Sequence, residues 1–523
     1  MRRTTALLFL LLIAPAHAQT FAADAALDPR LIVNVYVTAL AFMAPRTLEP
    51  VPVGQLTIWG LNGLTALDPN LAAEWHNNKV QLLASTRLLT EQQAPAANDV
   101  QAWATLAAEF AAIAAGSSRP VRRAGNQGVV QSFFDELFNH LDPYSRYVGP
   151  TEANEDRELR AGRAGAGLQL FQRGAAIVVF SAVSDGPGAR AGIRPGDMIL
   201  AVDGQAAQGK DARRVANWID GPEQTRVTVI WRGHDGRQHT ADMQRAMVPP
   251  ETVYSERIEN MLVIQVTAFN RSTATHLTDA IQEGLAATRR PDGIVLDLRG
   301  NPGGILRQAV EAAGTLLPDG VVVITAGRDP EATRIWRSTG SDLAEYVPVV
   351  VLVDGRTASA AEILAAALAD RGRAVVVGSS TLGKGLVQTI APLPDGGELF
   401  VTWSRVLAPR GWPIQGLGVL PQLCTSLGQD SLSLQLATLS QGRDAMAPAI
   451  ATQRTARAPL SSPQILAIRD ACPAAGGRDT DMDAARILIR DPGAYASALL
   501  PPIREDSQTV GASSQKMDHG TAP

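Results

Sequence analysis

The sequence is poor in lysine and in aromatic residues. Of its 47 basic residues only Lys79, Lys210, Lys384 and Lys516 are lysines, and the other 43 are arginines. Aromatic residues make up 5% of the 523 residues, and the formal net charge of −4 offers no global attraction to nucleic acid. Because an arginine in a protein stays protonated, a reaction that needs a neutral amine as its base must use one of these four lysines.

Long apolar runs are also missing beyond the first residues. Residues 1–18 combine two arginines, a short apolar stretch at 6–14 and the small residues Ala16 and Ala18, which is the pattern of a secretory signal peptide. The stretch is too short to span a bilayer, and no later window reaches about 18 uncharged apolar residues. We therefore expect an exported, periplasmic protein that begins at Gln19 and has no integral membrane segment.

Cysteine is nearly absent, with Cys424 and Cys472 as the whole complement. In an exported chain we expect these two to form a disulfide that ties the C-terminal segment to the preceding domain, and free buried thiols are the alternative. A two-cysteine zinc site is disfavoured because no histidine lies near either residue in the sequence. We expect no metal and no cofactor.

The length predicts three or four domains, at roughly 100–200 residues each. Residues 19–160 have apolar residues at helical spacing and predict a helical N-terminal domain, which we expect to contact a second copy of the chain or an adaptor protein. Residues 161–248 show short β-like runs between Gly and Pro turns. Residues 426–523 carry weaker signals, and the polar tail after about residue 504 is predicted to be disordered.

Between residues 249 and 425 strands and helices alternate, which favours an α/β core with a largely parallel sheet. We predict strands at 262–266, 293–298, 321–325, 347–353 and 374–377, and helices at 273–286, 306–317 and 359–370. Chemistry in such sheets collects in the loops beyond the carboxyl ends of the strands.

Two of these loops have the composition of an oxyanion site. Residues 297–304 run from a strand into a glycine-rich turn, whose N–H groups can face an anion, although a plain tight turn explains the same pattern. Ser359 stands at the predicted start of a helix, where the N–H of Ala360 can help to hold an oxyanion. The alternative reading of Ser359 is an ordinary helix cap.

The third loop places Lys384 among glycines. Gly378, Gly383 and Lys384 fit the phosphate-binding pattern G-x-x-x-x-G-K-[ST], and this makes a nucleotide-binding loop an alternative. However, Gly385 replaces the hydroxyl residue that binds Mg²⁺, and β-like residues follow instead of a helix. These departures disfavour nucleotide binding.

A serine nucleophile needs a base, and histidine is poorly placed for that role. None of the seven histidines lies between residue 277 and the C-terminal tail, and no G-x-S-x-G elbow is present. A Ser-Lys pair remains, since burial disfavours the charged form of a lysine and the neutral amine can then take the proton of the serine hydroxyl.

Ser359 in Thr-Ala-Ser-Ala-Ala-Glu, Lys384 in Thr-Leu-Gly-Lys-Gly and Gln388 four residues later resemble the catalytic constellation of the carboxyl-terminal processing peptidases. The segments 141–147, 299–304 and 416–421 are also similar to that family. The resemblance covers about residues 130–425. It departs from the family at Ala361, where another serine is frequent, and at Gln422, where aspartate is usual.

This resemblance implies a ClpP/crotonase-like protease core and a serine endopeptidase. Ser359 is then the nucleophile, Lys384 the general base and Gln388 the amide that orients the lysine. The implied oxyanion hole combines the N–H of Ala360 with that of Gly303 or Gly304.

Residues 161–248 resemble a PDZ domain through the segment 189–197, a helix at 211–219 and the hairpin turn at Asp203 and Gly204. The resemblance implies a loop that receives the carboxylate of a substrate's C-terminus beside an apolar pocket, formed by Gly165, Ala166, Gly167 and Leu168. We therefore expect protein or peptide substrates with apolar C-termini. The alternative function is a non-catalytic scaffold that only binds peptides, and turnover of such a peptide discriminates the two.

Overall fold

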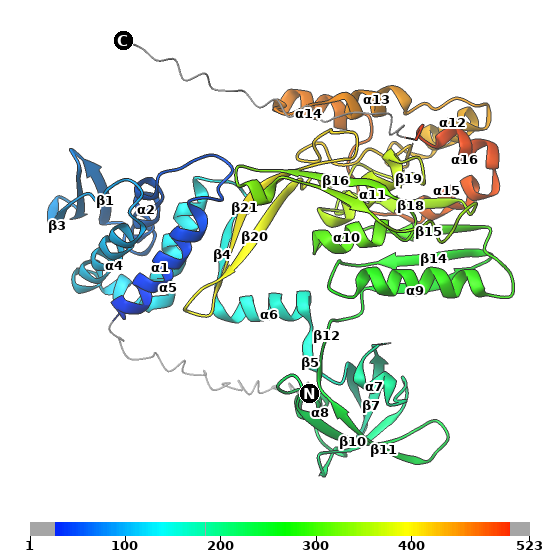
Figure 1. Cartoon of the computed structure of the whole chain (residues 1–523), viewed down its shortest axis with the longest axis horizontal. Helices are drawn as coiled ribbons and strands as arrows, with labels where there is room; N and C mark the ends of the chain where they lie inside the picture. Colours follow the sequence, from blue (N-terminus) through cyan, green and yellow to red (C-terminus); the bar gives the residue numbers. More distant parts are fainter. Residues whose placement is uncertain (1–26, 184, 503–523) are drawn as a thin grey trace, which may run out of the picture. The chain divides into compact units, whose positions relative to one another are not determined.

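A computed structural model describes residues 27–183 and 185–502, so the predicted signal peptide and the tail after residue 504 lie outside the described residues. The chain divides into two compact units (Figure 1). Within the described part, the first unit holds residues 27–44, 51–147 and 393–395, and the second unit holds the rest.

The first unit is built mainly from helices around an aromatic core. Its described helices are α1 (Pro29–Met43), α2 (Val53–Asn62), α3 (Leu64–Leu67), α4 (Val100–Ser117) and α5 (Arg119–Asn139). Tyr36, Trp103, Phe110 and Phe134 are almost completely buried. No helix in the described part of the chain is both long and apolar enough to cross a membrane.

The predicted helical N-terminal domain also contains strands, at residues 71–93. These residues form an antiparallel sheet of β1 (Leu71–His76), β2 (Lys79–Ala84) and β3 (Arg87–Gln93). Asn77 and Asn78 both adopt positive φ angles, of 49° and 61°, which is the turn that favours a two-residue hairpin. Leu71 and Ala73 are buried and alternate with more exposed residues, as expected for a strand. In the sequence this pattern is hard to see beside the alanine-rich helical segments.

The PDZ-like module has its own sheet and its own core. A short strand β4 (Arg146–Val148) and helix α6 (Pro150–Ala161) precede it. Its sheet has the order β11-β10-β8-β7-β6, with β9 paired to β8, and β5 pairs with β12 at the two ends of the module. The strands are β5 (Arg163–Gly165), β6 (Leu168–Arg173), β7 (Ala176–Ala182), β8 (Met198–Val202), β9 (Gln205–Ala206), β10 (Arg226–Arg232), β11 (Gln238–Gln244) and β12 (Ala246–Val248), and the helices are α7 (Pro187–Arg190) and α8 (Ala212–Ile219).

The central sheet of the second unit has the order β13-β14-β15-β18-β19-β22. All neighbours from β14 to β22 are parallel, as predicted, and β13 adds an antiparallel edge. The strands are β13 (Val253–Ile258), β14 (Met261–Val266), β15 (Gly293–Asp297), β18 (Val349–Val353), β19 (Val375–Gly378) and β22 (Leu423–Cys424).

Helices cover both faces of this sheet, and the two faces draw on different parts of the chain. Ile294 and Leu296 pack into one core with α9 (Thr273–Ala286), α10 (Leu306–Ala313) and α11 (Ala360–Asp370). Val295 packs into a second core with the C-terminal helices α12 (Gln429–Ser440), α15 (Asp479–Arg490) and α16 (Pro492–Ala498). The described part of segment 426–523 therefore belongs to the α/β core, which corrects the predicted boundary at residue 425. Two further helices of that segment are α13 (Ala447–Thr455) and α14 (Ser462–Arg469).

A second sheet in this unit has the order β17-β16-β21-β20. The strand predicted at 321–325 belongs here, and not to the parallel sheet, because β16 pairs antiparallel with the strand that follows it and with a later long hairpin. The strands are β16 (Gly320–Ala326), β17 (Arg334–Ser338), β20 (Leu386–Pro392) and β21 (Glu398–Leu407), and a 3₁₀ turn η1 (Pro330–Ala332) connects the first two.

The two cysteines form a disulfide. Cys424 lies in β22 at the edge of the central sheet, and Cys472 lies between α14 and α15. Both side chains are completely buried. The bond therefore attaches the connection between two C-terminal helices to the central sheet.

Candidate active site

Three loops meet at one edge of the central sheet, because β15, β18 and β19 are parallel neighbours and their carboxyl ends lie together. The loop after β15 is joined to the loop after β18 by a hydrogen bond from Gly300 N to Asp354 Oδ1 of 2.9 Å. The loop after β19 is joined to the loop after β18 by a bond from Leu382 N to Thr357 O of 2.9 Å. Ser359, Lys384 and the glycine-rich turn thus belong to one cluster.

Ser359 occupies a strained backbone position between β18 and α11. Its φ of 55° and ψ of −118° lie outside the regions that residues with a side chain prefer. Such strain costs roughly 1–3 kcal/mol and persists only where the surroundings enforce it, most often at functional sites. The residue is partly exposed, while its neighbours Ala358 and Ala360 are buried. This combination is typical of a nucleophile presented on a sharp turn between a strand and a helix.

Glu362 joins the Ser359 segment to the Lys384 segment. Its completely buried carboxylate accepts bonds from Ser359 N at 2.8 Å and from Lys384 N at 2.9 Å, both on Oε2. On Oε1 it accepts a bond from Gly383 N at 2.7 Å and one from the Thr381 hydroxyl. Burial raises the pKa of this carboxyl above its ordinary value, and the four donors act in the opposite direction. The two segments are held side by side by this single acceptor.

The glycine-rich turn lies directly against Ser359. Gly303 has a φ of 96°, and a Cβ on it would be 2.7 Å from Ser359 Cβ, so only glycine allows this approach. Its N–H donates to Asn301 Oδ1 at 2.8 Å. The buried Asn301 also donates from Nδ2 to Val266 O at 2.7 Å and accepts from Ala358 N at 2.9 Å. Asn301 therefore fixes the turn to both β14 and the serine segment.

Lys384 and Gln388 lie on the stretch that leads from the third loop into β20. Both are half-buried. The side-chain amide of Gln388 donates to Leu386 O and to Thr402 Oγ1, each at 3.1 Å, which fixes its orientation on the second sheet. A strand, not a helix, follows Lys384, and the N–H groups of Gly383 and Lys384 are bonded to Glu362. The loop therefore lacks the arrangement that would cradle a phosphate.

A cluster of charged residues stabilises the loops that follow β15 and β18. Asp297 at the end of β15 binds Arg299 through Nε at 2.9 Å and Nη2 at 2.7 Å, and this pairing raises the pKa of the guanidinium. Burial would raise the pKa of Asp354, but bonds from the N–H groups of Gly300, Arg356 and Gly477 hold it below its ordinary value. The carboxylate at the start of the serine loop is therefore ionised.

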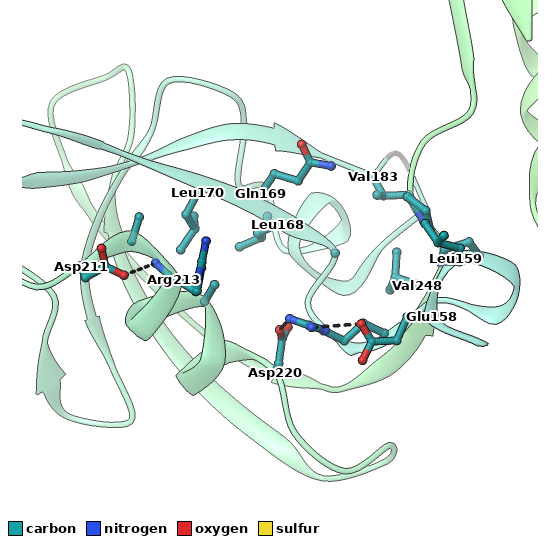
Figure 2. A pocket seen from close by; sticks show the side chains of 16 residues that line it. Glu158, Leu159, Leu168, Gln169, Leu170, Val183, Asp211, Arg213, Asp220 and Val248 are labelled. Atoms are coloured by element: carbon teal, nitrogen blue, oxygen red, sulfur yellow. Dashed lines mark hydrogen bonds and ion pairs between the residues drawn. The ribbon is translucent and has the colours of Figure 1, made fainter. Parts of the chain in front are cut away.

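The PDZ-like module contains a cavity of about 820 Å³ between β6 and α8 (Figure 2). Leu168 and Leu170 of β6, Ala216 of α8 and Gly167 line it. Figure 2 shows Arg213 across from the two leucines. β6 is the edge strand of its sheet among the described residues, so its outer side faces the cavity. Gly167 and Leu168 of the predicted loop thus line a groove that has both apolar and charged residues.

Charged residues lie at the opposite end of this groove from Asp211 (Figure 2). Arg163 donates to Asp220 Oδ2 and to Glu158 Oε2, each at 3.0 Å. The carbonyls of Ala166 and Gly167 accept hydrogen bonds from Gly188 N at 2.8 Å and from Val183 N at 2.9 Å. The loop is held in place by bonds to its carbonyl groups.

Comparison with known proteins identifies both regions. The model of peptidase family S41 matches residues 260–424, and that of the PDZ domain matches residues 178–233. The carboxy-terminal-processing protease of Bartonella bacilliformis is 32% identical over 303 residues, which cover 57% of this chain and 70% of the relative. The chain belongs to peptidase family S41.

Two further similar proteins are also named as C-terminal processing proteases. The carboxy-terminal processing protease CtpA of Bacillus subtilis is 33% identical over 288 residues, which cover 55% of this chain and 61% of that protein. A solved photosystem II D1 C-terminal processing protease aligns with a TM-score of 0.34 and 29% identity, over 58% of this chain and 86% of that structure. This S41 member is accordingly a serine-type peptidase with a PDZ domain.

Sequence reasoning assigned no role to Glu362 or Asn301. The Glu362 signal was present, because an acidic residue three positions after a serine is the pattern of a capping box and this one stands on an otherwise apolar helix. Asn301 gave no such signal, since an asparagine before proline and glycine is ordinary in a turn. Both positions bind backbone groups that only the tertiary fold brings near.

The Glu362→Gln variant tests the role of the buried carboxylate. An amide has one acceptor oxygen, so its nitrogen would face one pair of the four donors and move the Ser359 and Lys384 segments apart. We expect kcat to fall about 10- to 100-fold, because small displacements of reacting groups have effects of that size. Glu256→Gln on the exposed edge strand is the matched control. Unchanged peptide turnover by Glu362→Gln would refute this positioning role.

Proposed function

We propose that this S41 peptidase is exported, captures the C-terminus of a protein substrate on its PDZ module and cleaves peptide bonds through an acyl-enzyme on Ser359, with Lys384 as the base. The observation that carries the proposal is the strained Ser359 joined through one carboxylate to the backbone of Lys384. Among the three lysines in the described part of the chain, Lys384 is the one that follows a strand of the parallel sheet.

In the first step the neutral amine of Lys384 takes the proton of the Ser359 hydroxyl while Oγ bonds to the substrate carbonyl carbon. The carbonyl oxygen becomes an oxyanion, and we assign its donors to the N–H groups of Ala360 and Gly304. Gly304 is preferred over Gly303 because the N–H of Gly303 is bonded to Asn301. The N-terminus of α11 adds a favourable dipole at this point.

In the second step the tetrahedral intermediate collapses, the C–N bond breaks, and the leaving amine takes a proton from the Lys384 ammonium. Water then attacks the acyl carbon while the regenerated amine accepts its proton. The C–Oγ bond breaks, Ser359 Oγ takes a proton back from the Lys384 ammonium, and the second product leaves. Gln388 has one acceptor oxygen in its amide, and we assign to this oxygen the orientation of the lysine. The bonds from its nitrogen to Leu386 and Thr402 support this assignment.

Substrate capture follows from the edge position of β6. An extended peptide adds a strand to such an edge by main-chain hydrogen bonds, and side-chain pockets beside the edge give specificity. The groove beside β6 is lined by Leu168, Leu170 and Ala216, which fits an apolar C-terminal residue. The N–H groups of residues 165–168 then receive the terminal carboxylate.

Export to the periplasm is supported by the signal-like residues 1–18 and by the disulfide, since disulfides persist in oxidising compartments. The arrangement of the two sheets and α9 to α11 supports a ClpP/crotonase-like core. For the N-terminal unit we keep the proposal that its helices contact a second copy of the chain or an adaptor protein.

A pair of substrates tests the proposal. An unstructured polypeptide with a free apolar C-terminus should be degraded, and the same polypeptide with a C-terminal amide should show a kcat/KM about 10- to 100-fold lower, because the carboxylate supplies charge-assisted hydrogen bonds. Mass spectrometry of the products gives both rates. Binding of the free C-terminus without any cleavage would favour the scaffold function instead, and equal cleavage of both substrates would contradict capture by the PDZ module.

A further inference from the structure

Residues 472–481, which we call the C-terminal strap, contact all three loops of the candidate active site. The strap begins at the disulfide-bonded Cys472, runs without helix until α15 begins at Asp479, and ends at Asp481. It lies outside the part of the chain that matches the S41 family model, which ends at residue 424. Nothing in the catalytic scheme above uses it.

One residue of the strap bridges the approaches to Ser359 and to Lys384. The carbonyl of Ala475 accepts a bond from Gly355 N at 2.7 Å, four residues before Ser359, and a bond from Ser379 Oγ at 3.0 Å, five residues before Lys384. Ala475 N donates back to Ser379 Oγ at 3.0 Å. The neighbouring Ser380 hydroxyl donates to the carbonyl of Cys472.

The rest of the strap holds the glycine-rich turn through Arg299. Arg299 Nη1 donates to the carbonyl of Arg478 at 2.7 Å and to the carboxylate of Asp481 at 3.2 Å. Asp481 is almost completely buried and also accepts from Thr425 Oγ1 at 2.6 Å, beside Cys424. Gly477 N donates to Asp354 Oδ2 at 3.1 Å, on the carboxylate whose other oxygen binds Gly300.

The disulfide fixes the start of this strap to the sheet. Cys424 pairs with Gly378 at the end of β19, so the bond anchors Cys472 beside the strand from which the Lys384 loop departs. Between α14 and α15 no backbone ladder holds residues 470–478. They are held by separate hydrogen bonds to the loops and by the packing of Ala471 and Cys472 in a small apolar cluster. The covalent anchor therefore adds to these hydrogen bonds in keeping the strap against the three loops.

We propose that the C-terminal strap is a positioning device for the catalytic loops, and that its function requires the oxidised Cys424–Cys472 pair. The inference rests on the proposed function, since it assigns what holds that site in register. When the pair forms, two S–H bonds break and one S–S bond forms, and two electrons and two protons pass to a disulfide oxidant that leaves as a dithiol. The peptidase is thus active only after oxidation, which happens in an oxidising compartment.

Two adjacent glycines provide a matched test of the strap. A Cβ on Gly477 would lie 2.8 Å from Arg299 Cδ, whereas a Cβ on Gly476 meets nothing within 4 Å. Gly477→Ala should displace Arg299 and lower kcat about 10-fold or more with KM unchanged, since the strap acts on the reacting loops and not on the peptide groove. Gly476→Ala should keep the wild-type kcat.

The Cys424→Ala/Cys472→Ala double variant tests the requirement for oxidation. We expect the same loss of kcat, with unchanged binding of a labelled peptide to the PDZ module and a melting temperature above the assay temperature. We also expect faster hydrogen exchange at the amides of residues 355–359 and 380–384. A double variant that does not fold leaves the glycine pair as the deciding measurement.

Equal kcat in Gly477→Ala and Gly476→Ala, or full activity in a folded double variant, would overturn the inference. If the wild-type chain itself cleaves no peptide, the proposed function fails instead, and the exchange rates then decide on the strap alone. In that case, unchanged amide hydrogen exchange in both loops of the folded double variant would overturn the inference about the strap.

Discussion

Ser359→Ala is expected to reduce kcat by about 10⁴- to 10⁶-fold, because the loss of a serine nucleophile removes the acyl-enzyme route and leaves only the oxyanion site and substrate binding. The alanine keeps a Cβ at the strained φ of 55°, so the fold and the peptide groove should be unchanged. Peptide turnover, a melting curve and binding of a labelled C-terminal peptide measure these three properties.

Two companion variants sharpen this prediction. Ser255→Ala, on the exposed edge strand β13, should keep full activity. Ser359→Gly should be as inactive as Ser359→Ala but at least as stable, because glycine adopts the positive φ without the strain of roughly 1–3 kcal/mol. If the Ser359→Ala variant still formed an acyl-enzyme in a single turnover, Ser359 would not be the nucleophile.

Lys384→Arg is expected to reduce kcat by about 10³- to 10⁴-fold, in the range found when a member of a catalytic set is removed. Arginine keeps the positive charge but does not release its proton in a protein, so a charge-only role would survive the change and a base would not. Alkaline pH should not restore the variant. Lys210→Arg, at an exposed position of the PDZ module, is the matched control and should behave like the wild type.

The double variant Ser359→Ala/Lys384→Arg separates joint from independent action. Residues that act as one unit show losses that do not multiply, so the double variant should be no slower than Ser359→Ala alone. Independent contributions would instead multiply the two losses. A Lys384→Arg enzyme with wild-type kcat would show that another group takes the proton.

Much of the catalytic architecture is predictable from the sequence because it rests on local patterns. Helix α9 has the predicted limits, and α11 differs by one residue at its start. The apolar strands before Ser359 and Lys384 are strong signals, and the rule for parallel strands then brings their loops to one edge of the sheet. The candidate site is therefore predictable from the sequence alone.

The elements that sequence reasoning missed depend on distant partners. β16 reads like any strand of a parallel sheet, and its place in a second sheet follows only from its pairing with β21, more than seventy residues later in the chain. Our proposal of Gly304 over Gly303 as an oxyanion donor rests on the bond from Gly303 N to the side chain of Asn301. The residues after 426 show only weak helix patterns in the sequence, yet they form helices whose apolar faces pack on the sheet.

The C-terminal helices also determine when the core around the central sheet is complete. The second face of the central sheet, with Val295 and Val350, is fully covered only when α15 and α16 join α12 on it. Ser359 and Lys384 are therefore synthesised well before the sheet that aligns them is complete. A chain without α15 and α16 would therefore contain Ser359 and Lys384 but leave part of one face of the sheet that aligns them uncovered.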